Sequence, residues 1–586
     1  MNFLSVTGKN WNIREINERQ VYQYINEYGI SDFIARVLIS RNIPFESIPH
    51  FLEPRIKDLM PDPFHFLDME KACLRVASAI LNNEKIIVLG DYDVDGATSS
   101  ALLIRVLKSL GCDAKAYIPD RIVEGYGPTI PVIEKFGSLG INLIITVDCG
   151  VTAFEPVAKA NELGIDTIIL DHHMSDITLP SAYAIVNPNR FDETTKYKDL
   201  AAVGVAFLFS VGLIKILREK KFFEGKVEPN LLNLLDLVAL GTVCDMMNLT
   251  GLNRAFVIQG LKIMQQQKNL GLKTLLNLGK IDILPNSYHL GFVIGPRINA
   301  GGRVGKSYLG SLILSTDIEE EAQKYAMELE NYNEERKLIE QQVLEEALEM
   351  AASQINNNFI LVYSEGWHQG VVGIVAGKLK EKFQKPVAAV AVEKGIGKAS
   401  CRSVKGIDFG RKIVEAKNAG ILLSGGGHSM AAGFTIDMQK MEELKLFLTE
   451  SLSKHEDALK ENKICYYDAE IAPAGINSDL ADEIKKLEPY GNGNIEPVVK
   501  ISGLYVLKAS VTNNKHINCL LAPTKEAYGN KAIRAISFNS VGTPISEALL
   551  SKHPLKLTIF GNVKLNSWQG KTNVQIYIND IHYEPN

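Results

Sequence analysis

The sequence predicts an α/β multidomain protein with a parallel-sheet domain, a long connector helix, a second α/β domain and a C-terminal OB-like β-barrel. Three observations predict this order. From about residue 60 to 310, short apolar runs alternate with helical patterns, as in a parallel sheet with crossover helices. Residues 311–359 then contain no Gly or Pro. From about residue 465, short alternating strands are separated by Asn and Gly turns.

Composition and charge fit a folded chain of several domains. Its 586 residues suffice for several units of about 150 residues each, and 46% of them are hydrophobic, which is ample for buried cores. The net charge is −5, so no basic excess covers the whole chain. Residues 501–586 alone hold nine Lys and Arg against four Asp and Glu, a local +5 that favours a polyanionic partner there.

No segment predicts secretion or a membrane span. Residues 1–14 lack the apolar core of a signal peptide. The longest apolar stretch, Leu200 to Ile214, has 15 residues, whereas a span needs about 20. Seven cysteines are scattered without a C-x-x-C pair, which argues against a zinc site and a disulfide framework. We therefore expect a protein of the reducing cytoplasm that does not bind membranes.

The patterns divide the chain into five parts, namely a helix-rich lead-in (1–55), the parallel-sheet domain (56–310), a connector (311–357), a second α/β domain (358–464) and an OB-like nucleic-acid-binding barrel (465–586). We expect residues 317–354 of the connector to form one stiff helix of up to about 50 Å. Two shorter helices broken near residues 331–333 are the alternative. The barrel, with its basic surplus, suits binding of single strands. Its predicted strands carry the aromatic candidates Tyr505, Phe538, Trp568 and Tyr577.

An acidic cluster is the most informative motif of the first domain. Asp91, Asp93 and Asp95 alternate directly after the apolar run 86–90, which we interpret as a buried strand. Carboxylates this close repel one another unless cations neutralise them, and oxygen ligands favour Mg²⁺ or Mn²⁺. An EF-hand loop would need Glu at its twelfth position, where Leu102 stands. A solvated turn is the ordinary explanation of one acidic cluster in isolation.

The same arrangement recurs along the chain. Three more apolar stretches end in acid or imidazole side chains, namely Asp148 after 141–147, Asp171, His172 and His173 after 167–170, and Asp245 after 231–244. Sites of open α/β sheets lie at the carboxyl ends of the strands. Four segments thus offer ligands to one place, which suits a two-metal phosphoester site. His172 alone would be an ordinary surface or core histidine, but Asp171 beside it can orient an imidazole as a ligand.

Two glycine-rich segments are candidate phosphate sites. Ser424 to Gly433 predicts a turn that runs into a helix of small residues, where free N–H groups at Gly426 and Gly427 would bind an anion and His428 would add a donor. A tight turn packed on a neighbouring strand is the equal alternative. Arg402 and Ser403 lie in the same domain and supply further donors.

Residues 300–307 nearly match a P-loop. Ala300 stands where that motif needs Gly, and no compact strand precedes it, so we do not expect ATP binding. Arg297 and Arg303, which flank these glycines, are better suited to a nucleic-acid phosphate.

Together these residues resemble a known family. The four acidic motifs are similar to the phosphoesterase motifs of the DHH superfamily, and Gly425 to Gly433 is similar to its DHHA1-type second domain. Residues 200–207, 299–303 and 487–494 resemble the RecJ branch, the single-stranded-DNA-specific exonucleases. The resemblance covers about residues 60–586.

The resemblance implies the roles of individual residues. Two divalent cations, Mn²⁺ or Mg²⁺, would lie between the two α/β domains, and an OB fold would close a ring around the strand. The implied catalytic and metal-binding set is Asp91, Asp93, Asp148 as the bridge, His172 and Asp245, with His173 beside the metals and Asp95 as a candidate additional ligand. The phosphate- and DNA-binding set is Arg297, Arg303, Arg402, Ser403, Gly426, Gly427 and His428. Residues 398–403 depart from the family's more glycine-rich run, so the contacts to the 5′-phosphate stay open.

The implied activity is metal-dependent 5′-to-3′ exonucleolytic hydrolysis of single-stranded DNA to 5′-mononucleotides, in DNA repair and recombination. One alternative is a phosphodiesterase for oligoribonucleotides or cyclic dinucleotides, which would need no long strand path. Another is a non-catalytic single-strand-binding scaffold, which would not need mutually repelling carboxylates. Single-stranded DNA is the predicted partner, a single-strand-binding protein or a helicase is the candidate protein partner, and we expect a monomer.

Overall fold

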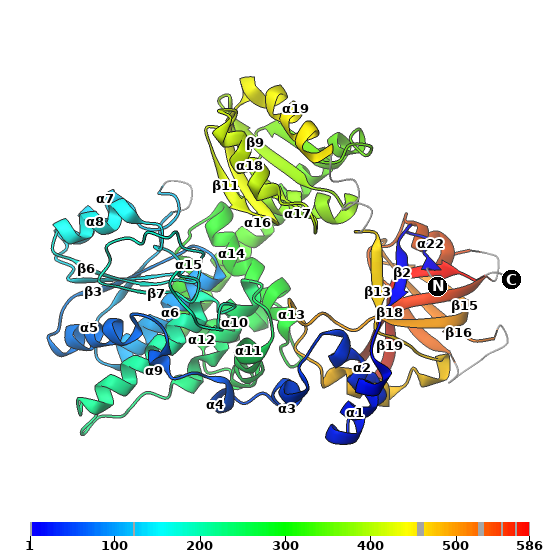
Figure 1. Ribbon diagram of the computed structural model, residues 1–586, viewed down its shortest axis with the longest axis horizontal. Coiled ribbons are helices and arrows are strands. Elements are labelled where there is room, and N and C mark those ends of the chain that lie inside the picture. Colours follow the sequence, from blue (N-terminus) through cyan, green and yellow to red (C-terminus); the bar gives the residue numbers. More distant parts are fainter. Residues whose placement is uncertain are drawn as a thin grey trace.

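The computed structural model describes residues 3–120, 124–453, 462–524, 532–551, 555–568 and 571–584. Within them, a parallel sheet, a mixed sheet and a barrel follow one another along the chain in the predicted order, with one small additional sheet (Figure 1). In the part of the chain that the structure describes, no helix is both long and apolar enough to cross a bilayer.

A five-stranded, all-parallel sheet builds the first domain, in the order β4-β3-β5-β6-β7. Its strands are β3 (Ile86–Gly90), β4 (Lys115–Tyr117), β5 (Leu143–Val147), β6 (Asp166–Leu170) and β7 (Ala184–Val186). Every residue of β3 and β5 is buried. Their sequences are apolar runs rather than alternating patterns because helices cover both faces of a parallel sheet.

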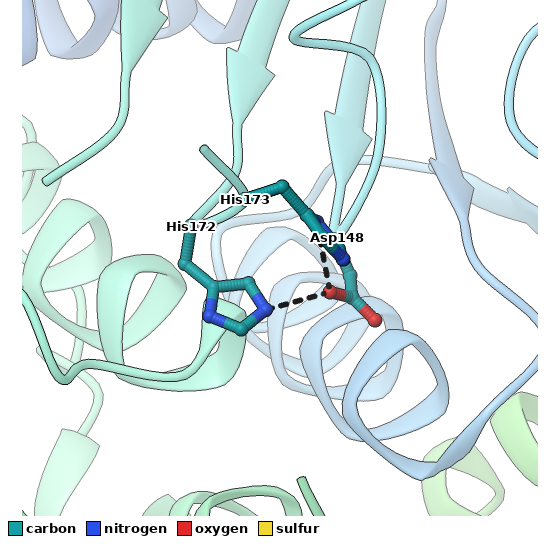
Figure 2. A group of neighbouring side chains, drawn as sticks. All are labelled: Asp148, His172 and His173. Carbon is teal, nitrogen blue, oxygen red and sulfur yellow. Dashed lines mark ion pairs between the residues drawn. The ribbon is translucent and has the colours of Figure 1, made fainter. Parts of the chain in front are cut away.

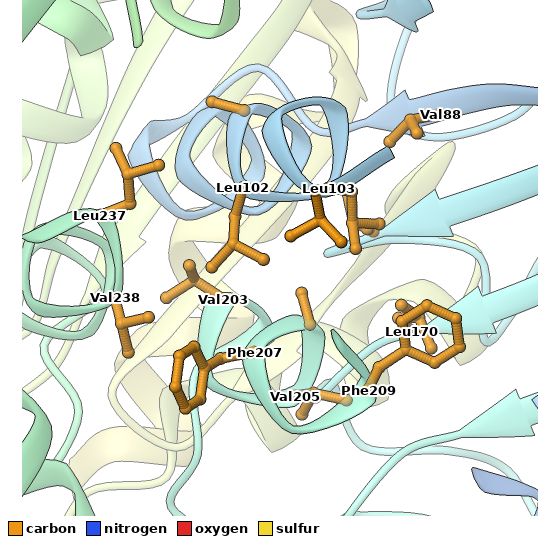
Figure 3. Packing of buried hydrophobic residues seen from close by; sticks show 14 of the residues in the cluster. Val88, Leu102, Leu103, Leu170, Val203, Val205, Phe207, Phe209, Leu237 and Val238 are labelled. Atoms are coloured by element: carbon orange, nitrogen blue, oxygen red, sulfur yellow. The ribbon is translucent and has the colours of Figure 1, made fainter. Parts of the chain in front are cut away.

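Helices cover this sheet, and further helices pack beside it. They are α4 (Ile56–Leu59), η2 (Pro63–His65), α5 (Met69–Leu81), α6 (Val94–Ser109), α7 (Ile130–Ser138), α8 (Phe154–Glu162), α9 (Ala202–Glu219), η3 (Leu231–Leu234), α10 (Leu235–Cys244), α11 (Gly251–Met264), α12 (Leu270–Leu278), α13 (Ser287–His289), the π-helical turn η4 (Leu290–Ile294), α14 (Gly295–Val304) and α15 (Leu309–Ser315). The apolar stretch from Leu200 is the buried helix α9. Leu102 of α6, Phe207 of α9 and Leu237 of α10 belong to one core cluster on one face of the sheet (Figure 3).

Residues 300–307 fall in and after α14, which confirms that they form no P-loop.

One unbroken helix, α16 (Glu319–Ala352), joins the first domain to the second. Its 34 residues correspond to about 51 Å at 1.5 Å per residue, so the single-helix prediction is confirmed and the break near residues 331–333 is wrong. Ala326 and Leu329 pack in the core of the first domain, whereas Val343 and Ala347 pack in that of the second. The helix therefore fixes the distance between the two domains.

The second domain contains a mixed sheet in the order β11-β12-β10-β9-β8, in which only β8 and β9 are parallel. Its elements are β8 (Ile360–Glu365), α17 (Val372–Phe383), β9 (Val387–Glu393), β10 (Ile396–Arg402), α18 (Phe409–Asn418), β11 (Ser424–His428), β12 (Ala431–Asp437), η5 (Met438–Lys440) and α19 (Met441–Leu452).

The predicted helix after the glycine-rich turn is wrong, because Ser424 to Gly433 forms the β11–β12 hairpin. Ala432, Phe434 and Ile436 are buried and alternate with less buried residues, which is the period of a strand. Gly427 adopts φ +146°, and a Cβ there would lie 2.5 Å from the carbonyl oxygen of Ala431. The glycines thus serve close packing of a hairpin.

The C-terminal domain is a closed barrel, which confirms the OB-like prediction. Its strands are β15 (Val499–Thr512), β16 (His516–Ala522), β17 (Ile533–Ser537), β18 (Lys556–Trp568) and β19 (Lys571–Tyr583), accompanied by β14 (Ala469–Glu470), η7 (Pro473–Gly475), α21 (Ser478–Lys485) and α22 (Pro544–Leu549). They follow the order β15-β16-β17-β19-β18, and pairing of β18 with β15 closes the ring. The side chain of Trp568, an aromatic candidate for strand binding, lies outside the described residues.

The lead-in packs on the barrel rather than preceding the first domain as a separate helical segment. It forms β1 (Phe3–Leu4), β2 (Asn10–Ile13), α1 (Glu18–Tyr28), α2 (Asp32–Ser40), η1 (Phe45–Ser47) and α3 (Ile48–Leu52). β2 pairs in parallel with β13 (Ile464–Tyr467). Trp11 of β2 stacks on Phe560 of β18 at 4.6 Å between ring centroids, and its Nε1 donates to Asp580 over 3.0 Å. The apolar sides of α1 and α2 join the barrel's core cluster.

Candidate active site

The predicted acids meet at the carboxyl edge of the parallel sheet. Each follows the end of an element, namely Asp91 and Asp93 after β3, Asp148 after β5, His172 and His173 after β6, and Asp245 after α10. Their side chains form three overlapping sets whose ligand atoms lie within 4.8 Å of one another, namely Asp91, Asp93 and Asp148; Asp148, His172 and His173; and Asp95, His172 and Asp245. Asp148 and His172 each belong to two sets, so the three sets form one continuous centre.

Asp148 occupies the middle of this centre. His172 Nε2 lies 3.3 Å and His173 Nδ1 3.9 Å from Asp148 Oδ1, and Figure 2 shows both imidazoles directed at that oxygen. Asp148 adopts φ +60°, a conformation that non-glycine residues hold only where the surroundings impose it. Its N–H donates to Leu170 over 3.0 Å, and its carbonyl accepts from the hydroxyl of Tyr126 over 3.0 Å. These bonds fix the turn that presents the carboxylate.

The carboxylates repel one another strongly. Burial, followed by repulsion from Asp93 and Asp95, raises the pKa of Asp148 well above its usual range. Burial and then the same two neighbours raise the pKa of Asp245 as well. Asp245 Oδ2 is buried and accepts no hydrogen bond from any residue that the structure describes. A divalent cation would relieve the repulsion and satisfy this oxygen, so the donor set of carboxylates and imidazoles fits Mn²⁺ or Mg²⁺.

The two histidines carry different charges. Burial and then the positive charge of His173 lower the pKa of His172 to about 4, so His172 is neutral, the form in which an imidazole is a ligand. Burial alone would lower the pKa of His173 too. Its 2.8 Å hydrogen bond to Asp171 Oδ1 and the attraction of that carboxylate outweigh burial and raise the pKa of His173 to about 9. His173 is therefore a cation beside the centre.

Asp171 holds the two histidines in place. Its Oδ1 accepts from the backbone N–H groups of His172 and His173 over 2.8 and 3.1 Å, and its Oδ2 accepts from Val151 over 3.1 Å. Burial would raise the pKa of Asp171, but the bonds from His173 outweigh it and lower that pKa to about 2. The structure thus makes Asp171 the orienting residue anticipated from the sequence, for the ring of His173 rather than for that of His172.

Asp95 binds the start of α9 beside the metal centre. Its Oδ2 accepts from the N–H of Ala202 over 2.7 Å and its Oδ1 from that of Val203 over 3.0 Å, so both oxygens bind the first turn of α9. Asp95 Oδ2 also lies 3.9 Å from His172 Nε2. Burial, followed by repulsion from Asp93, raises the pKa of Asp95 to about 7. These bonds explain the motif 200–207, whereas a role of Asp95 as a metal ligand stays a prediction.

A cavity of about 700 Å³ opens beside the centre, between the two α/β domains. Its lining includes Tyr92, Asp93 and Arg303 from the first domain and Lys398, Arg402 and Gly426 from the second. Arg303 also bridges the domains, because its Nη1 donates to the carbonyl of Gly370 over 3.1 Å. Three residues of the predicted phosphate-binding set therefore line one cavity, namely Arg303, Arg402 and Gly426.

Four residues of that set do not line the cavity. Arg297 forms an ion pair with Glu330, with 2.6 Å between Nε and the carboxylate. Ser403 is buried, and its Oγ donates to the carbonyl of Ile407 over 2.7 Å. Gly427 and His428 continue β11 beyond Gly426, and both are exposed.

Sequence reasoning missed Lys398 and Tyr92. The signal for Lys398 was present, because Lys398, Ser400 and Arg402 alternate along β10 and all three line the cavity. Tyr92 lies between two of the acids, where the motif drew attention to the carboxylates alone.

Comparison with known proteins covers nearly the whole chain. Three family models match it: DHH family, N-terminal domain, at residues 85–242; DHHA1 domain at residues 356–454; and RecJ OB domain at residues 467–580. The chain is 32% identical over 580 residues to the single-stranded-DNA-specific exonuclease RecJ of Bacillus subtilis, a match that covers 97% of this chain and 70% of that protein. The chain belongs to the RecJ family.

Solved RecJ structures share this fold. The crystal structure of RecJ from Thermus thermophilus in complex with Mn²⁺ superposes with a TM-score of 0.81 at 26% sequence identity, covering 98% of this chain and 80% of that one. RecJ from the same organism in complex with Mg²⁺ gives a TM-score of 0.75 at 25% identity, with coverages of 98% and 78%. The RecJ resemblance inferred from the sequence motifs is therefore confirmed over nearly the full length.

Proposed function

We propose that this RecJ-family chain is a metal-dependent exonuclease that hydrolyses single-stranded DNA. The observation that carries the proposal is the continuity of the acidic centre with a cavity lined by Arg303, Lys398 and Arg402. This combination suits hydrolysis of a phosphodiester bond. The carboxylates would bind the metal ions, and the cationic side chains would bind the charged nucleic-acid backbone. A relative that matches 97% of the chain carries the name of this activity.

Two cations, Mn²⁺ or Mg²⁺, would be held by Asp91, Asp93, Asp148, His172 and Asp245, with Asp148 shared between them. Such ions, when bound, supply an activated water and neutralise charge on the reacting phosphate. Asp171 keeps His173 protonated, so the His173 imidazolium donates a charge-assisted hydrogen bond to a phosphate oxygen. His172 stays neutral at the same pH and leaves its Nε2 lone pair available.

We infer that cutting starts at the 5′ end and releases 5′-mononucleotides. The cavity of about 700 Å³ has the size of a small-ligand site. Arg402 and Lys398 on its second-domain side would bind a terminal phosphate one nucleotide beyond the cut. Asp93 belongs both to the centre and to the lining, which supports this short spacing.

The barrel carries a surface suited to the rest of the strand. The rings of His516, Phe538 and Tyr577 form a chain with 5.1 Å between neighbouring centroids. A groove of about 430 Å³ lies on the same strands and is lined by Lys508 and Arg534 together with amide side chains. Bases stack on exposed aromatic rings and phosphates pair with cations, without any need for sequence readout.

The first domain adds a second aromatic pair. Tyr288 and Phe292 stack at 5.1 Å and are 61% and 72% exposed. Burial is the largest cause of the raised pKa of Tyr577, and Tyr288 contributes to the same rise, which places the two aromatic groups near each other. They would form a path for a long single strand, which a dinucleotide phosphodiesterase would not need.

The decisive experiment uses single strands of about 30 nucleotides labelled at either end, with Mn²⁺. We expect early release of the 5′ label as a mononucleotide, late release of the 3′ label, and no cutting of blunt duplex. Release of the 3′ label first, or equal rates on duplex, would contradict the proposal. Cleavage of cyclic dinucleotides in preference to long strands would favour the phosphodiesterase alternative.

We place the enzyme in the reducing cytoplasm as a monomer. Its seven cysteines, all within the described residues, form no disulfide, and four of them are buried. A single-strand-binding protein or a helicase stays the predicted protein partner.

A further inference from the structure

A segment next to the barrel reaches the residue that follows a predicted metal ligand. Residues 487–494 come after α21 and lie against the first domain. The side-chain amide of Asn492 donates to the carbonyl of Met246 over 2.8 Å, and the N–H of Leu249 donates to the carbonyl of Asn492 over 2.8 Å. Met246 directly follows Asp245, so the segment is one residue away from the metal centre.

The loop after Asp245 begins with a left-handed residue. Met246 adopts φ +56°, a conformation that is uncommon for non-glycine residues and that occurs where helices end. Its side chain is 71% exposed, so packing of that side chain does not hold the conformation. The backbone bonds of Met246 to Val243 and of Met247 to Thr242 close the end of α10 over 3.1 Å each. The amide of Asn492 braces the other side of the loop, at the Met246 carbonyl.

The bracing segment is itself rigid. The fully buried Arg254 of α11 donates to the carbonyls of Leu487 and Glu488 over 3.2 and 2.7 Å, and to that of Phe51 over 2.7 Å. Asn494, also fully buried, donates to the carbonyls of Leu487 and Pro489 over 2.8 Å each. The segment is thereby held to the first domain and to the lead-in.

Glycines allow the two backbones to approach closely. A Cβ on Gly491 would lie 2.7 Å from Leu249 Cδ1, and one on Gly493, at φ +70°, would lie 3.0 Å from Asn248 Cβ. Gly491 and Gly493 therefore pack directly against Leu249 and Asn248 of the loop 246–249. A displacement of the segment is transmitted to the loop directly.

We propose that Asn492 is a positioning residue for Asp245, and that residues 487–494 couple the seating of the barrel to the geometry of the metal centre. Without the amide, the Met246 carbonyl loses a hydrogen bond and the loop relaxes. The Asp245 carboxylate is then held less precisely relative to His172. Groups that orient a ligand typically change metal affinity or activity by about 10- to 100-fold. The bond is exposed, so we expect the lower end of this range.

The test measures Mn²⁺ binding to the full chain without DNA, by the loss of the electron paramagnetic resonance signal of free Mn²⁺. Asn492→Ala is expected to weaken Mn²⁺ binding about tenfold, to lower kcat by a similar factor, and to leave the affinity for long single strands unchanged. Asn492→Gln, which keeps the amide donor, is expected to recover part of both losses. The matched control is Asn161→Ala, which removes an exposed amide-to-carbonyl bond of 2.8 Å to Ser181 elsewhere in the first domain.

Wild-type Mn²⁺ affinity in a folded Asn492→Ala variant would overturn the inference. Asn492 is exposed, so truncation leaves no cavity; if Tm nevertheless falls by several degrees, Asn492→Leu keeps the volume without the donor and decides in its place. Equal loss of strand affinity and Mn²⁺ affinity would also count against it, since that pattern marks general disruption. Only the expected change in kcat rests on the proposed function. A wild-type chain without exonuclease activity would refute that function, while the Mn²⁺ measurement would still test Asn492.

Discussion

Asp148 lies in the middle of the metal centre and, like His172, belongs to two of the three ligand sets. We predict that Asp148→Ala abolishes hydrolysis in Mn²⁺ while the fold stays intact. Burial and the neighbouring carboxylates raise the pKa of Asp148, so removing it relieves a repulsion and the Tm without ions should stay equal or rise. Turnover and thermal unfolding of the same preparation check both statements. Near-normal turnover by the Asp148→Ala variant would refute the assignment of Asp148 as a metal ligand.

The raised pKa values of Asp148 and Asp245 also predict how stability depends on pH without ions. In the folded state these groups keep protons that the unfolded chain releases, so stability is lost as pH rises. His173, whose pKa is raised to about 9, acts in the same direction between pH 7 and 9. We expect Tm in a chelator to fall across this window and saturating Mn²⁺ to restore it. A Tm that increases from pH 7 to 9 in the chelator would contradict this account.

At the residue scale, the sequence predicted those side chains whose position follows from a strand end. Asp148 and His172 could be placed at one edge because parallel strands share a direction. The engagement of Asp95 with α9 could not, because it depends on how a distant helix packs. Met246 likewise carries no sequence signal for its left-handed backbone, since that conformation is imposed by its surroundings.

At the scale of elements, β10 presents Lys398, Ser400 and Arg402 to the cavity. We predict that Arg402→Ala slows cutting more on 5′-phosphorylated than on 5′-hydroxyl strands, by about tenfold in the ratio if one charge-assisted bond of about 1.5 kcal/mol is lost. Paired rates on the two substrates measure this ratio.

The exposed Arg411→Ala is the control, since Arg411 pairs with Glu415 on α18. His428→Ala should change the ratio less than Arg402→Ala, because His428 does not line the cavity. The reverse order of these two variants would show that β11, rather than β10, holds the phosphate.

The elements also show where local patterns mislead. The small residues of 424–433 are compatible with a turn and a helix or with a hairpin, and the burial of alternate residues in a sheet decides for the hairpin. The long helix was predictable because its 34 residues contain no breaker. The strands β1 and β2 were not, because they have two and four residues and β2 pairs with a strand far along the chain.

At the scale of the whole molecule, the barrel's aromatic surface is expected to hold the strand. We predict that Phe538→Ala with Tyr577→Ala weakens binding of a strand of about 30 nucleotides, at about 1–3 kcal/mol for each stacked base, and leaves binding of short strands nearly unchanged. Fluorescence anisotropy at several salt concentrations measures both. Tyr22→Ala, which removes a tyrosine 67% exposed on α1, is the matched control. Equal losses on short and long strands would contradict the path.

Substitutions test the barrel better than its deletion does. The apolar sides of α1 and α2 and the core of the barrel form one cluster, so removal of residues 465–586 would expose the lead-in as well. Loss of strand binding by such a truncated chain would then report unfolding of two parts at once.

The pairing of β2 with β13 and the stacking of Trp11 on Phe560 set the order in which the chain can mature on the ribosome. Trp11 is translated roughly 550 residues before its partner Phe560. At about 5–20 residues per second, the segment that contains Trp11 waits roughly half a minute to two minutes, while the two α/β domains between them can fold as units. The pairing of β2 with β13 can thus form only after both α/β domains have been translated, and non-local pairing of this kind is slow.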